Sequence, residues 1–115
     1  MAVVTRKFHR KVGQRRTFFR SLAYNLIMKG GIQTTVARAK SIRPMVERML
    51  TIAKKNRLAD LRLLIAKLDN KEPAMKLFYE LAPKYKERKG GYLRVLKIDG
   101  SRRRDGAQMA KIEFV

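Results

Sequence analysis

A chain of 115 residues has room for one domain with a modest core, and its hydrophobic share of 45% is ordinary for a globular protein. Its 29 lysines and arginines stand against 9 aspartates and glutamates, and the resulting net charge of +20 predicts a polyanionic partner. The lack of cysteine and the single histidine, His9, exclude disulfides, thiolate metal sites and histidine-cluster metal centres, so we expect no metal and no cofactor.

The N-terminus and the hydropathy pattern bear on location. No apolar run approaches the roughly 20 residues that cross a bilayer. The opening residues, MAVVTRKFHRK, lack the apolar stretch of a secretory signal and are too short for an intact transit peptide followed by a domain. We therefore expect a soluble, intracellular protein. Nucleic acid is the favoured polyanion, and an anionic membrane surface is the competing one.

The first 46 residues carry only positive charge, because the first acidic residue is Glu47. A one-signed block is typical of a nucleic-acid-binding arm, whereas a solvated surface should mix signs. Residues 1–13 lack apolar periodicity and predict an extended RNA-binding arm, with a single domain over residues 14–115. In this block we expect RNA contacts from Arg6, Lys7, Phe8, His9, Arg10, Lys11, Arg15, Arg16, Arg20, Arg38, Lys40 and Arg43. Phe8 either stacks on an unpaired base or anchors the arm on the domain.

Helical periodicity begins at about Gln14. The first stripe contains Phe19, Leu22, Ala23 and Leu26, with Arg16 and Arg20 beside it. Gly30-Gly31 ends this helix, because glycine readily adopts positive φ, and Ile32–Val36 is a short β-prone segment.

A second helix is expected from a Thr35 cap to about Lys55, where Asn56 closes it. Pro44 should kink this helix without breaking it, since the periodicity continues in register on both sides. Its buried face is expected to contain Ile42, Met45, Val46, Met49, Leu50 and Ala53.

Two more helical stripes follow. The third stripe is Leu58, Leu61, Ile65 and Leu68. The turn 69–73 leads into a fourth helix, with Pro73 tolerated in its first turn. The fourth stripe is Ala74, Leu77, Phe78, Leu81 and Tyr85, interrupted at Pro83.

After Gly90-Gly91 the periodicity changes to two, which predicts strands. Leu93 and Val95 share one face of the first strand, residues 99–106 form a loop, and a last strand alternates Ala110, Ile112 and Phe114 with charged residues. Sequential strands usually pair, so these two predict a hairpin. The expected class is α+β: about four helices on one face of a small sheet with a C-terminal β-hairpin, preceded by a basic N-terminal arm.

Two further basic groups lie in this C-terminal part. The first precedes the glycine pair, and the second occupies the hairpin loop. Three adjacent arginines at a loop tip cannot enter a core, so they are either idle surface or a phosphate clamp, and the overall charge favours the clamp. Here we expect RNA contacts from Lys86, Arg88, Lys89, Arg94, Arg102, Arg103 and Arg104.

The sequence offers little for catalysis. The nine carboxylates are scattered, no nucleophile motif is present, and neither phosphate-binding glycine signature occurs. His9, among cations, reads as an RNA contact, so we expect no enzyme and no small-molecule substrate. A nucleoid-type DNA-binding protein is the first rival class, although no dimer signal is present. A membrane-surface protein is the second, although tryptophan is absent.

Several blocks resemble a known family. In order, they are FFRSLAYNLI, GGIQTTVARAKSIRPMVERMLTIAKK, MKLFYELAPKYKERKGGYLRVLK and MAKIEFV, and over roughly residues 6–115 the chain is similar to the seventeenth protein family of the bacterial large ribosomal subunit. The resemblance implies an α+β fold and binding to large-subunit ribosomal RNA near the exit-tunnel side. It also implies one copy per ribosome, neighbouring large-subunit proteins, a cytoplasmic location, and neither catalysis nor a cofactor. The first five residues are less basic than is usual for this family.

Overall fold

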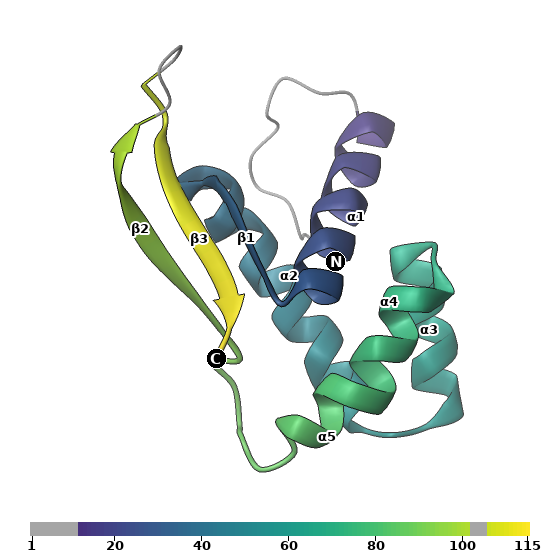
Figure 1. Cartoon of the computed structure of the whole chain (residues 1–115). Coiled ribbons are helices and arrows are strands. Elements are labelled where there is room, and N and C mark those ends of the chain that lie inside the picture. The colour runs from purple at the N-terminus through teal and green to yellow at the C-terminus, as the bar shows by residue number, and fades with distance from the viewer. Residues whose placement is uncertain (1–11, 102–105) are drawn as a thin grey trace.

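Helices and a small antiparallel sheet form two layers in the computed structural model, which describes residues 12–101 and 106–115 (Figure 1). The elements are α1 (Val12–Lys29), β1 (Gly31–Thr35), α2 (Val36–Lys54), α3 (Leu58–Leu68), α4 (Lys71–Lys76), the π-helical η1 (Leu77–Leu81), α5 (Ala82–Lys84), β2 (Leu93–Ser101) and β3 (Gln108–Phe114). The predicted α+β class is confirmed. The division into an arm and a domain stays a prediction, because residues 1–11 lie outside the described ranges.

The sheet has the order β1-β3-β2, and β3 pairs antiparallel with both neighbours. The predicted C-terminal hairpin is therefore confirmed. In-register pairs such as Thr34 with Ala110 and Val95 with Ile112 place the apolar side chains on the face that α2 covers. The expected loop over residues 99–106 is wrong at its start, because β2 continues to Ser101. A register shift between Lys97 and Ser101 lets the pairing continue past the Asp99-Gly100 turn signal.

Local signals set the ends of α1 and α2. Gly30 adopts φ +81°, and its N–H donates to the carbonyl of Leu26 at 2.9 Å, which ends α1 as predicted. Thr35 is the predicted cap of α2, since its hydroxyl oxygen accepts from the N–H of Arg38 at 3.2 Å. Asn56 closes the helix with a φ of +58°.

α2 packs against all three strands and against α1, α3, η1 and α5, so it is the centre of the core. It runs through Pro44 without a break, as expected. Five of the six residues predicted on its buried face are buried, and Ala39 joins them. Met45 was expected there too, but it is only half-buried, because it lies at the rim of a hollow on the surface of the helix.

The third predicted stripe is partly wrong. Leu61 and Leu68 are buried as expected, but Leu58 is 60% exposed and Leu64 is fully buried. Leu58 is the first residue of α3 and lies beyond the edge of the core. Ile65 is half-buried, because α4 packs against the side of α3 that carries Leu61, Leu64 and Leu68.

The fourth stripe is confirmed, since Ala74, Leu77, Phe78 and Tyr85 are buried and Leu81 is half-buried. Asn70 caps this region by accepting from the N–H of Glu72 at 3.1 Å. Pro83 interrupts the helix in a specific way: it has no N–H and its ring would meet the carbonyl four residues earlier. The preceding turn widens, and the N–H of Ala82 donates to the carbonyl of Leu77, five residues back.

A buried carboxylate anchors the start of α3. Asp60 is 4% exposed, and it accepts from Nε of Arg57 at 2.7 Å and from its Nη2 at 3.1 Å. These hydrogen bonds lower the pKa of Asp60 below its usual value. Because its pKa is lower in the folded state, Asp60 stabilises the fold at pH values above its unfolded pKa of about 3.9. This stabilisation is lost as the pH falls through the folded-state pKa.

We therefore expect Asp60→Asn to reduce the free energy of unfolding at pH 7 and to flatten the fall of this free energy as the pH drops below about 4. Urea unfolding measured at pH 7 and at several lower pH values gives both effects. Glu87→Gln removes an exposed carboxylate that has no ion pair among the described residues, so it serves as the control. An unchanged slope in Asp60→Asn would show that the Arg57 pair does not contribute to acid sensitivity.

Candidate nucleic-acid interface

Most of the expected RNA contacts that the structure describes lie near two opposite ends of the molecule, whereas Arg20 and Arg43 lie in the middle of α1 and α2 and Arg94 lies near the start of β2. The start of α1, the first turns of α2 and the β2–β3 end of the hairpin lie at one end, and the loop between α5 and β2 lies at the other (Figure 1). The principal extents are 45 × 30 × 22 Å. A polyanion that contacts both ends must therefore span the long axis of the domain.

At the first end, Arg16 and Lys40 are exposed and Arg15 is half-buried. None of the three side chains has an ion pair or hydrogen bond with another described residue, so their charges are open to solvent. Arg38 is different: its guanidinium lies 5.0 Å from the centroid of the Phe18 ring, and Phe18 packs edge-on against Phe19 with ring centroids 5.1 Å apart. This cation–π contact orients Arg38 between α1 and α2.

Three predicted contacts are also engaged within the protein. Arg20 donates from Nε to the carbonyl of Lys67 at 3.2 Å, and its Nη1 lies 3.9 Å from Oδ2 of Asp69. Arg43 lies 3.7 Å from a carboxylate oxygen of Glu47, and Arg94 donates to Glu113 at 3.0 Å. Arg20 therefore joins α1 to the end of α3 within the protein.

At the opposite end, Lys86 and Lys89 are exposed, and their side chains too have no ion pair or hydrogen bond among the described residues. Arg88 is also exposed, but its Nε donates to the carbonyl of Gly90 at 3.3 Å and so holds its own loop. The structure brings these cations together on one loop, as the sequence predicted.

Lys54 fixes this basic loop to α2, a role that the sequence analysis missed. Its Nζ donates to the carbonyl of Arg88 and, at 2.8 Å, to the hydroxyl of Tyr92. Tyr85 donates to the carbonyl of Val115 at 2.5 Å, and its ring lies 5.7 Å from that of Tyr92. No local signal could have identified Lys54, because its partners lie 34 and 38 residues away along the chain.

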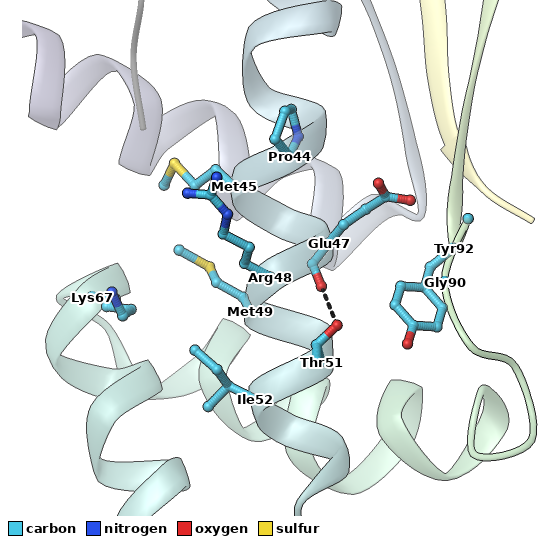
Figure 2. A pocket seen from close by; sticks show the side chains of 11 residues that line it. Pro44, Met45, Glu47, Arg48, Met49, Thr51, Ile52, Lys67, Gly90 and Tyr92 are labelled. Atoms are coloured by element: carbon cyan, nitrogen blue, oxygen red, sulfur yellow. Dashed lines mark hydrogen bonds between the residues drawn. The ribbon is translucent and has the colours of Figure 1, made fainter. Parts of the chain in front are cut away.

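A hollow of about 520 Å³ lies across the surface of α2 (Figure 2). Figure 2 shows Met45, Met49 and Ile52 on one side of the helix and Glu47 and Thr51 on the side toward Tyr92. Glu47 accepts from the N–H of Leu93 at 3.3 Å, so its carboxylate attaches α2 to β2. The hollow is therefore lined in part by thioether and aliphatic side chains, and the Glu47 carboxylate in it serves to join α2 to β2.

Within residues 12–101 and 106–115, no group of three or more histidine, aspartate or glutamate side chains is arranged to hold a metal ion. No helix in the same part of the chain is long and apolar enough to cross a membrane.

The remaining predicted contacts fall on residues that the structure does not describe. They are Arg6, Lys7, Phe8, His9, Arg10 and Lys11 of the arm and Arg102, Arg103 and Arg104 of the hairpin loop. Their roles stay predictions.

Comparison with known proteins supplies a family. The family model "Ribosomal protein L17" matches residues 18–115. "Large ribosomal subunit protein bL17" of Persephonella marina is 54% identical over 114 residues, which cover 98% of this chain and 92% of the relative. The protein of the same name from Sulfurihydrogenibium sp. is 43% identical, with 98% and 93% covered. That from Dictyoglomus turgidum is 46% identical, with 96% and 94% covered.

Proposed function

Because the chain belongs to the ribosomal protein L17 family, a family of structural constituents of the large ribosomal subunit, we propose that it binds and stabilises folded large-subunit ribosomal RNA. The family is one of structural proteins and not an enzyme class. From the family resemblance we further propose that one copy lies near the polypeptide exit-tunnel side, beside neighbouring large-subunit proteins.

Two exposed basic groups at opposite ends of the domain support this proposal most directly. Arg16 and Lys40 lie at one end and Lys86 and Lys89 at the other, and none of these charges is neutralised by a described acidic residue. Lysine and arginine neutralise phosphates and fix orientation without reading sequence. The two ends favour folded RNA that wraps the domain over a single duplex groove, since folded RNA is recognised by its shape.

Packing between the two ends supports the role of a rigid spacer. α2 contacts every strand, and the Lys54 hydrogen bonds fix the basic loop to it. The arm over residues 1–13 would thread between RNA elements, and the arginines of residues 102–104 would clamp phosphates at the hairpin loop.

Replacing Arg16 by alanine tests this function at a single residue. The exposed side chain has no described partner, so the free energy of unfolding should stay within about 0.5 kcal/mol. The slope of log affinity for large-subunit ribosomal RNA against log salt should fall by about 0.7–0.9, the value of one phosphate contact. Filter binding of the full chain at several salt concentrations measures the slope.

Arg62→Ala is the matched control, because Arg62 is an exposed arginine on α3 outside both basic groups. It should leave the slope unchanged. Equal slopes for the two variants would remove Arg16 from the interface. Failure of the unmodified chain to bind this RNA in a salt-dependent way would overturn the proposed function.

A further inference from the structure

A polar cleft separates α1 from the turn that joins α3 to α4. It has a volume of about 370 Å³ and is lined by Arg20, Ser21, Tyr24 and Asn25 from α1 and by Asp69 and Asn70 from the turn. These α1 residues recur at one-turn spacing, so they form a continuous polar face beside the buried stripe of the same helix. This volume lies at the small end of the range of ligand sites.

The charges in the cleft do not suit a phosphate. One arginine is present, but Asp69 lies 3.9 Å from it, and the other polar groups are hydroxyls and amides. A carboxylate repels phosphate. A phosphate site in a chain with so many lysines and arginines is expected to be lined by cations alone, and this cleft is not. The cleft instead suits a neutral ligand that presents hydrogen-bond donors and acceptors.

The backbone of Asp69 is fixed at the end of α3, and its carboxylate is accessible to a ligand. It ends α3 in the left-handed conformation with φ +53°, and its side chain is 80% exposed. No described residue donates a hydrogen bond to it, and Arg20 stays at 3.9 Å. The neighbouring Glu72, in contrast, accepts from the Tyr24 hydroxyl at 3.3 Å.

Among the four RNA bases, guanine matches this arrangement. Its Watson–Crick edge carries two adjacent donors, N1–H and N2–H, which can bind both oxygens of one carboxylate, whereas each other base presents a single donor group there. Its O6 and N7 are acceptors that suit a guanidinium. Arg20 is already fixed beside Asp69 by its bond to the carbonyl of Lys67.

We propose that this cleft binds an unpaired guanine of the ribosomal RNA, with the Asp69 carboxylate accepting from N1–H and N2–H and Arg20 donating to the acceptor edge. Two exposed cations border the cleft: Arg16 lies one turn before Arg20, and Lys71 follows Asn70. They would contact the phosphates that flank the guanine. This assignment rests on the proposed RNA binding and adds a base contact to it.

Asp69→Asn is the discriminating change. Asparagine adopts the left-handed conformation as readily as aspartate, so the end of α3 is retained, while one carboxylate oxygen becomes a donor that cannot accept from guanine. Glu80→Gln, on the exposed surface of η1, makes the same change of charge away from the cleft. Ser21→Trp is a second variant, which fills the cleft from an exposed position on α1.

The probe is protein-free large-subunit ribosomal RNA, treated with a dicarbonyl reagent that modifies N1 and N2 of unpaired guanines. The unmodified chain and Glu80→Gln should protect at least one such guanine. Asp69→Asn and Ser21→Trp should restore its reactivity, and Asp69→Asn should weaken binding about tenfold.

The remaining outcomes separate the two proposals. If Asp69→Asn protects every guanine that the unmodified chain protects, the cleft does not read a base. If the unmodified chain binds with a normal salt slope but protects no unpaired guanine, the base contact is wrong and the proposed function stands. If the unmodified chain shows no salt-dependent binding to this RNA, both proposals fail.

Discussion

Replacing Leu26 by alanine is expected to lower the free energy of unfolding by about 2–5 kcal/mol. Leu26 lies on α1 in the buried cluster with Ala23 and Ile27, and its side chain is fully inaccessible to solvent. Truncation removes buried methyl groups and leaves a cavity that the rigid packing of α1 against α2 and α4 can fill only in part. Urea unfolding followed by far-UV circular dichroism measures the change.

Two leucines provide internal controls for this prediction. Leu22 lies on the same helix but is half-buried, so Leu22→Ala should have a smaller effect than Leu26→Ala. Leu58 is 60% exposed, and Leu58→Ala should change the free energy of unfolding by no more than about 0.5 kcal/mol. If Leu22→Ala destabilised the fold more than Leu26→Ala, the rotation of α1 against the core would be wrong.

The same residues show how far the apolar pattern could predict the fold. Three- and four-residue spacing predicted that residues 14–29 form a helix and that Phe19, Ala23 and Leu26 face the core. The predicted stripe also contained Leu22 and left out Ile27, which flanks it on the opposite side. Packing against α2 and α4 buries Ile27 fully and leaves Leu22 half-buried, so tertiary contacts set the final rotation.

The candidate interface could be predicted from the sequence only in part. The one-signed charge of the first 46 residues and the loop cations could be read directly, because charge is a property of composition. Which cations remain open to a partner could not be read, because it depends on distant residues. Arg20 bonds to Lys67, 47 positions away, and Arg94 pairs with Glu113 across the hairpin. The cleft at Asp69 was missed because α3 and α1 build it together.

Neutralising basic residues at both ends at once should have the largest effect on RNA binding. Lys86→Ala with Lys89→Ala removes two exposed cations from the loop after α5 while keeping Arg88, whose side chain holds that loop. Replacing all three arginines of residues 102–104 by alanine removes the predicted clamp between β2 and β3. The strand ends that carry this loop lie at the opposite end of the molecule (Figure 1).

Each phosphate contact contributes about 0.7–0.9 to the slope of log affinity against log salt. We therefore expect the double change to flatten the slope by up to about 1.8 units, and the triple change by up to about two. The strand ends that carry the hairpin loop lie at the opposite end of the molecule from the loop after α5, so the combined variant should lose the sum of the two, about three to four units. Filter binding to large-subunit ribosomal RNA at several salt concentrations measures all four slopes.

A matched double variant, Arg48→Ala with Arg62→Ala, removes two exposed cations from the middle of α2 and of α3, outside both ends, and should leave the slope unchanged. Thermal unfolding should show every variant to be folded, since exposed positions rarely contribute more than about 0.5 kcal/mol each. The informative comparison is between the combined variant and the better of its two parts. A slope no flatter than that of one part would mean that the two ends do not contact the same RNA at the same time. The domain would then bind at one end, and its rigid long axis would have no role in holding RNA elements apart.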